Sequence, residues 1–169
     1  MKVSLSWLHS SRTVWEGVAA GVFGALSVAL WFLLGDAAAG RPLYTPAVLG
    51  SAIFHGATGP EEVRVTARIV VEYSLVHIAA FLALGIAISR LAAEAEESPP
   101  LISSLLILFL VIETFFIAVL FMLGTWLLEE LGLVSILVGN LLAAASMWAY
   151  LARCHPVLRD LISRNTEGE

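Results

Sequence analysis

The sequence predicts an all-α integral membrane protein, a four-helix bundle with a short interfacial or re-entrant helix between its first and second spans. Hydrophobic residues make up 59% of the 169 residues and charged residues only 14%, whereas soluble domains contain about half and a quarter. Four apolar stretches also reach the roughly 20 residues that a membrane helix needs. We expect one transmembrane domain over residues 1–169, surrounded by membrane lipids. The predicted spans are residues 17–35, 69–88, 103–126 and 133–151.

The first span contains no charged residue and is longer than the apolar core of a signal peptide, so we expect a retained helix. Its face formed by Gly17, Gly21 and Gly24 has almost no side chains, which lets another backbone approach closely. We predict that this face, and a similar strip on the fourth span, are packing surfaces within the protein. Contact with a partner protein, or no special role, are the alternatives. The strip on the fourth span consists of Ser135, Gly139 and Ala143.

The connection between the first two spans, residues 36–60, contains a further helix. Thr45 is suited to cap it and Pro46 to occupy its first position. The apolar stretch that follows, residues 46–55, is too short to cross a bilayer. We therefore expect a helix that lies at the interface and closes one end of the bundle, with a re-entrant element as the alternative.

The second span lies within a longer predicted helix that starts after Thr58 and continues to about residue 97. Thr58 and Glu61 have the spacing of a capping box, which places Glu61 in the first turn. Arg68 and Glu72 lie four residues apart, so we expect an ion pair between them near the membrane interface.

The third span lies within a helix that we expect to start at the Ser-Pro-Pro sequence of residues 98–100 and to run unbroken to about residue 128. Glu129 and Glu130 then fall in a tight turn before the fourth helix. Because the helix dipole disfavours carboxylates at a C-terminus, we expect both side chains to face solvent.

Lysine and arginine near the helix ends predict the orientation, because they concentrate on the cytoplasmic side. Six lie on the side of the two termini and three on the other side, so both termini should be cytoplasmic. The six are Lys2, Arg12, Arg90, Arg153, Arg159 and Arg164, and the three are Arg41, Arg64 and Arg68.

Three polar side chains from three spans fall at similar depth near the middle of the membrane: His77, Glu113 and Asn140. Tyr73 shares the helix face of His77. Ionisable groups are costly at this depth and turn inward to find partners. One interpretation is an interhelical hydrogen-bond network that fixes the packing of the helices. The other is a ligand or proton site, in which Glu113 exchanges a proton or receives a cation and His77 relays a proton.

Several functional classes find no support in the residues. The net charge of −5 leaves no basic patch for nucleic acid, and no catalytic or metal-binding motif is present, so we do not expect an enzyme or a metal site. Bis-histidine haem would need His77 to meet His55 from a re-entrant segment. We expect no cofactor, with haem, quinone and pigment left open.

Three segments together resemble a group of uncharacterised bacterial four-helix membrane proteins: GRPLYTPAVLG at residues 40–50, YSLVHIAAF at 73–81 and GNLLAA at 139–144. The resemblance implies a bacterial inner-membrane location and carries no activity. Small size, glycine-lined faces and long helix ends favour an accessory or scaffolding subunit of a larger bacterial membrane complex, with an energy-transducing complex as one candidate. The alternative is a small transporter, or a proton-, quinone- or pigment-binding protein, built around His77, Glu113 and Asn140.

Overall fold

The protein is all-helical in the computed structural model, which describes the backbone of residues 6–97 and 102–154 and the side chains of 11–93 and 110–154. Three helices have a stretch that is long and apolar enough to cross a membrane: α1 (Ser6–Ala38), α3 (Ala67–Glu97) and α6 (Leu133–Cys154). Together they indicate a membrane protein. A fourth long helix is α4 (Ile102–Leu123), and the part of it whose side chains are described, Leu110–Leu123, is a shorter apolar segment that contains Glu113.

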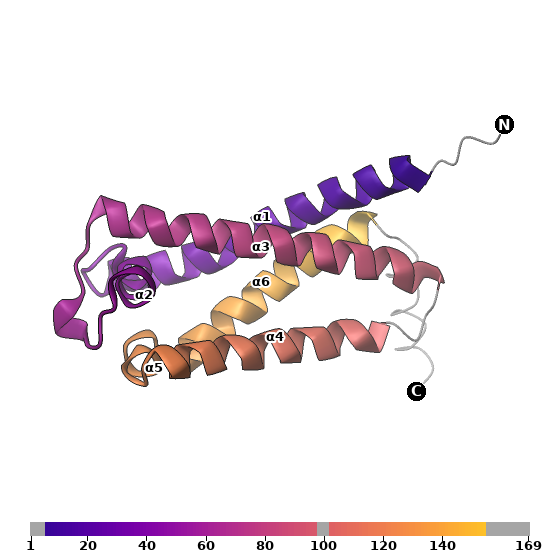
Figure 1. The fold of residues 1–169 in the computed structure, drawn as a ribbon. Helices are drawn as coiled ribbons and strands as arrows, with labels where there is room; N and C mark the ends of the chain where they lie inside the picture. The colour runs from indigo at the N-terminus through magenta and orange to yellow at the C-terminus, as the bar shows by residue number, and fades with distance from the viewer. Residues whose placement is uncertain (1–5, 98–101, 155–169) are drawn as a thin grey trace.

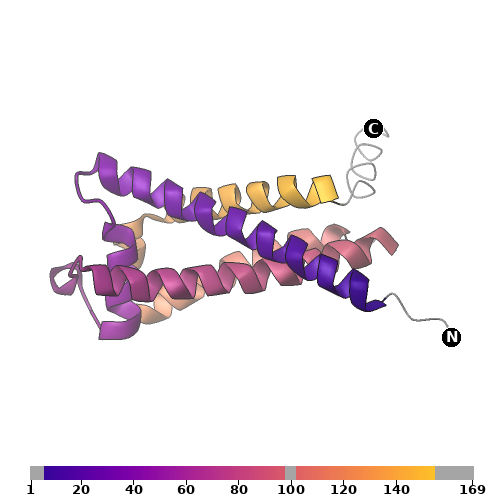
Figure 2. The ribbon, with the colours of Figure 1, turned by 90° about the horizontal axis from the view of Figure 1, so that it is seen from above.

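The four long helices run lengthwise, and two short helices lie at one end of them (Figure 1). The start of α1 and the end of α6 lie at the opposite end, together with the end of α3 and the start of α4. Helix α1 crosses α3 at an angle (Figure 2) and packs against both α3 and α6. The first and last described residues, Ser6 and Cys154, therefore lie at the same end of the long helices.

Helices α1 and α3 approach closely enough for their backbones to touch. A Cβ atom on Gly21 would lie 2.9 Å from the Cα of Leu82, and one on Gly17 would lie 2.8 Å from the carbonyl oxygen of Gly85. Ser89 Oγ adds a hydrogen bond across the contact, 2.9 Å to the carbonyl oxygen of Thr13. The glycines of α1 thus face another helix of the same chain.

The small-residue strip of α6 faces α1. A Cβ atom on Gly139 would lie 3.1 Å from Trp31 Cδ1, and Ala143 is buried. Trp31 Nε1 donates to the carbonyl oxygen of Ser135 at 3.0 Å. The indole therefore covers the strip and satisfies its own N–H group there.

The predicted short helix is α2 (Tyr44–His55), which crosses one end of the long helices (Figure 1). Its buried residues Val48, Leu49 and Ala52 share a core with Leu127 and Leu131 of the next short helix. Helix α2 therefore forms part of the packed interior at this end.

Thr45 does not cap α2 as predicted, because it lies inside the first turn. Its backbone N–H donates to Asp36 Oδ2 at 2.7 Å and its hydroxyl donates to Asp36 Oδ1 at 2.8 Å. A carboxylate from the end of α1 thus satisfies an N–H group that the start of a helix leaves unpaired. Leu43, at the cap position, adopts a left-handed conformation with φ of 66°.

The predicted start of the second helix is wrong. Thr58 bonds through its backbone N–H (2.8 Å) and hydroxyl to Glu62, not to Glu61. These acidic residues belong to a single 3₁₀ turn, η1 (Pro60–Glu62). Residues 63–66 form no regular structure. The hydroxyl of Thr66 accepts the N–H of Ile69 at 3.4 Å and so provides the local cap of α3.

The third helix is also shorter than predicted, because α4 ends at Leu123 and Gly124 adopts φ of 150°. A separate helix, α5 (Trp126–Leu131), follows. It contains Glu129 and Glu130, which we had expected in a turn. The Ser-Pro-Pro start at residues 98–100 lies outside the described residues, as do Lys2, Arg159 and Arg164.

Glu129 faces solvent as expected, but Glu130 does not. Glu130 Oε2 accepts a hydrogen bond of 3.1 Å from the Tyr44 hydroxyl and lies 3.6 Å from Arg41 Nη1. The Arg41 guanidinium also lies 3.9 Å from the centre of the Tyr44 ring. Burial raises the pKa of Tyr44, and its hydrogen bond to Glu130 raises it further, so the phenol keeps its proton and joins α2 to α5.

Candidate functional site

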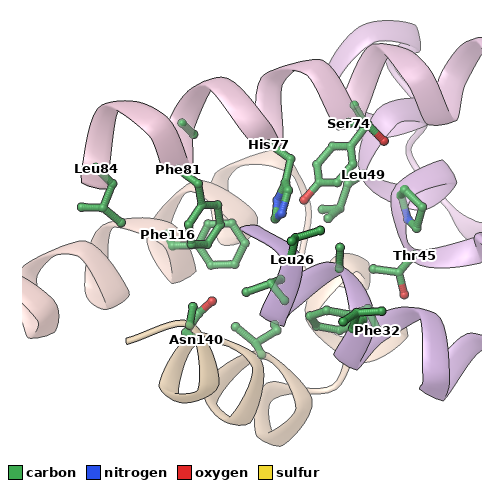
Figure 3. A pocket seen from close by; sticks show the side chains of 18 of the residues that line it. Leu26, Phe32, Thr45, Leu49, Ser74, His77, Phe81, Leu84, Phe116 and Asn140 are labelled. Atoms are coloured by element: carbon green, nitrogen blue, oxygen red, sulfur yellow. The ribbon is translucent and has the colours of Figure 1, made fainter. Parts of the chain in front are cut away.

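A cavity of about 910 Å³ lies between the helices. Its size falls within the range of about 300–1,000 Å³ that is typical of small-molecule sites. Most of the lining side chains are aliphatic or aromatic and come from α1, α2, α3, α4 and α6. Figure 3 shows Leu26 and Phe32 of α1, Leu49 of α2, Phe81 of α3 and Phe116 of α4 around the cavity.

A few polar side chains also line this cavity, and some of them bond within their own part of the fold. Asp36 and Thr45 bond to each other, and the hydroxyl of Ser74 donates to the carbonyl oxygen of Val70 in its own helix. The remaining four are the three residues predicted at mid-membrane depth and the tyrosine predicted on the helix face of His77. They are Tyr73, His77, Glu113 and Asn140.

Glu113 and Asn140 form a direct hydrogen bond between α4 and α6. Asn140 Nδ2 donates to Glu113 Oε2 at 2.7 Å. Glu113 is only 8% exposed, and its other oxygen, Oε1, is buried without a hydrogen-bond partner in the described part of the chain. A carboxylate group that bonds through one oxygen alone therefore lines the cavity.

His77 joins α3 to α1 instead of joining this pair. Its Nε2 atom lies 3.1 Å from the carbonyl oxygen of Ala25, and because a carbonyl oxygen only accepts, Nε2 must be the donor. The imidazole packs between Tyr73 and Phe81, with ring centres 5.8 and 4.8 Å apart. In Figure 3 it lies across the cavity from Asn140.

The predicted pair of Arg68 and Glu72 is present, with Arg68 Nε 2.8 Å from Glu72 Oε1. His55 joins it, because its Nε2 lies 2.9 Å from Glu72 Oε2. The histidine considered as a haem partner of His77 thus contacts a carboxylate near the start of α3. This three-residue cluster joins the C-terminus of α2 to α3.

Sequence reasoning missed Asp36 and Trp148 among the residues that line the cavity. Asp36 offered a signal, because it is a single carboxylate at the end of an uncharged membrane span and needs a partner there. Trp148 offered none, since one tryptophan in an apolar helix faces lipid as readily as a cavity.

Comparisons of the chain with protein-family models, with curated proteins and with solved structures found no match.

Proposed function

We propose that this protein is a four-helix membrane protein, with α4 as its fourth span, that binds a lipophilic molecule between its helices and has no catalytic chemistry of its own. The cavity of about 910 Å³ is the observation that carries the proposal. Helix α4 has 22 residues, which gives a length of about 33 Å, enough for the hydrocarbon core.

The character of the cavity walls indicates the kind of ligand. Aliphatic and aromatic side chains favour an apolar body, while Glu113, Asn140 and His77 supply the few polar groups that orient a ligand in such sites. These three residues lie well inside long apolar helices. The ligand would therefore enter from the bilayer, as expected of a transporter or of a protein that binds a quinone or a pigment.

Filling part of the cavity should weaken binding of a neutral probe. We expect 6-(1-pyrenyl)hexanol to bind saturably to the detergent-solubilised protein, measured by energy transfer from tryptophan to pyrene. Ala80 lines the cavity, so Ala80→Phe should weaken binding by about tenfold or more, equivalent to at least 1.4 kcal/mol. Ala79 lies on the same helix, is exposed and is outside the cavity lining. Ala79→Phe should bind as the parent does.

Two results would contradict this proposal. One is the absence of saturable binding to the parent protein. The other is an equal effect of the two phenylalanine substitutions, which would place the probe outside the cavity. Circular dichroism of each variant reports whether the helices remain folded.

The lengths of the helices favour a second candidate, an accessory subunit of a larger membrane complex. Helices α1 and α3 have 33 and 31 residues, against 22 in α4 and α6. At 1.5 Å per residue the first two exceed the hydrocarbon core by more than about 15 Å. A partner subunit would bind this extension. Isolation from its native membrane in mild detergent as a monomer without partners would refute this role.

Charge supports a location in a bacterial inner membrane with both ends cytoplasmic, since lysine and arginine favour that side. Arg90 and Arg153 lie near the ends of α3 and α6, on the side where α1 starts. Arg41 and Arg64 lie in the connections at the opposite end of the long helices.

A further inference from the structure

The cavity contains more negative than positive side chains. Two carboxylate residues line it, Asp36 and Glu113, and among the described lining residues there is no lysine or arginine. Both oxygens of Asp36 accept hydrogen bonds from Thr45. The Nε2 donor of His77 is occupied by the carbonyl oxygen of Ala25. The unsatisfied acidic group of the cavity is therefore Glu113.

One oxygen of the Glu113 carboxylate has no hydrogen-bond partner among the described residues. Its Oε2 atom receives a hydrogen bond from Asn140, while Oε1 is buried and receives none from the described residues. Ionisable groups at membrane depth normally pair with an opposite charge or a hydrogen-bonding group. Asn140 supplies one neutral donor and no charge. A ligand that brings both a positive charge and an N–H donor would complete the site.

The neighbouring aromatic rings suit the same kind of head group. Phe116 lies one helical turn from Glu113 on α4, and both Phe116 and Phe81 line the cavity (Figure 3). The face of an aromatic ring attracts a cation, more strongly where water is excluded. The aliphatic side chains of α1 and α6 line the rest of the cavity and suit the apolar part of a ligand.

We propose that the ligand is a lipophilic amine in its ammonium form, with its head group against Glu113 Oε1 and its apolar body in the rest of the cavity. This inference rests on the proposed function, that the cavity binds a lipophile, and adds the chemical class of that molecule. A neutral alcohol offers a donor to Glu113 but no charge, so it should bind more weakly than the amine of the same shape.

Two pyrene probes that differ only in their head group test the inference. At neutral pH we expect the parent protein to bind 6-(1-pyrenyl)hexylamine about tenfold or more tightly than 6-(1-pyrenyl)hexanol, a factor equivalent to 1.4 kcal/mol. Glu113→Gln keeps the size and hydrogen-bonding capacity of the side chain but removes its charge. It should reduce the affinity for the amine to that for the alcohol. Glu129→Gln removes an exposed charge outside the cavity lining and should leave the preference intact.

The outcomes separate this inference from the proposed function. Equal affinity of the parent for amine and alcohol, or a preference that survives Glu113→Gln, overturns the inference. Alcohol binding that Ala80→Phe prevents would still support a lipophile site in that case. No saturable binding of either probe to the parent refutes both. The comparison of the two probes on the parent needs no variant, and alcohol binding to the Glu113→Gln protein shows whether its cavity is intact.

Discussion

Replacing Gly85 by alanine should destabilise the protein by about 1–3 kcal/mol, the usual effect of inserting a methyl group into a packed contact. A Cβ atom at this position would lie 2.6 Å from the backbone N and 2.8 Å from the Cα of Gly21. Backbone atoms cannot rotate away as a side chain does. The substitution must therefore push α1 away from α3 and weaken the contact that Ser89 and Thr13 support.

Two other glycines provide matched controls in α1. A Cβ atom on Gly35 would meet nothing within 4 Å, so Gly35→Ala should not lower stability, since alanine is the better helix former. A Cβ atom on Gly24 would meet Met147 Sδ at 2.7 Å and Phe81 Cδ1 at 2.8 Å. Because these are side-chain atoms, Gly24→Ala should have an intermediate effect.

The stability of all three variants can be measured by unfolding them in mixed micelles of mild detergent and sodium dodecyl sulfate, with circular dichroism as the readout of helix content. Equal stability of the Gly85→Ala and Gly35→Ala proteins would show that the backbones of α1 and α3 do not touch.

This contact shows how far the sequence could predict the packing. The spacing of Gly17, Gly21 and Gly24 identified a face that a backbone could approach, and α3 lies against Gly17 and Gly21. Gly85, on the other side of the contact, was not predicted. A single glycine in an apolar span has no periodicity, so only the crossing of the two helices reveals its role.

The positions of the helix ends were harder to predict, because neighbouring residues offer more than one possible start or stop. Thr58 and Glu61 have capping-box spacing, but Thr66 caps α3 instead, because its hydroxyl accepts the N–H of Ile69. Gly124 ends α4 although the surrounding sequence remains apolar. Hydrophobicity predicts which segments are helical, and it carries little information on where one helix stops and the next begins.

The residues of the candidate site could be predicted from the sequence, but their hydrogen-bond partners could be predicted only in part. Counting residues along the helices placed His77, Glu113 and Asn140 at one level, and all three line one cavity. Which of them bond depends on which helices are neighbours and how each is rotated about its axis. His77 reaches the carbonyl oxygen of Ala25 because α3 packs against α1, whereas Glu113 and Asn140 meet where α4 approaches α6.

A second large effect on stability is expected at the hydrogen-bonded pair of Glu113 and Asn140. Asn140→Leu removes the donor at 2.7 Å and leaves both oxygens of buried Glu113 without a partner, which should destabilise the protein by about 1–3 kcal/mol. Replacing both residues together should cost much less, because two apolar groups in place of a hydrogen-bonded pair leave no unsatisfied atom. The double variant Glu113→Leu/Asn140→Leu should thus be more stable than the Asn140→Leu protein.

A double-mutant cycle measured by the same unfolding assay gives the interaction energy, which we expect to be about 0.5–3 kcal/mol for groups in direct contact. Thr114 is a suitable control, because its hydroxyl bonds to the carbonyl oxygen of Leu110 in its own helix. Thr114→Val should show additive effects with Asn140→Leu. If the effects of Glu113→Leu and Asn140→Leu on the free energy of unfolding are additive, the hydrogen bond between the two residues contributes nothing to stability.

The double variant also separates the two roles that Glu113 combines. If its hydrogen bond to Asn140 only holds α4 against α6, the apolar replacement restores that contact and leaves ligand binding unchanged. If Glu113 also receives an ammonium group through Oε1, the double variant should fold stably yet bind 6-(1-pyrenyl)hexylamine no more tightly than 6-(1-pyrenyl)hexanol. The free energy of unfolding and the preference for the amine would then change independently. The first depends on the hydrogen bond of Glu113 Oε2 to Asn140, and the second depends on Glu113 Oε1.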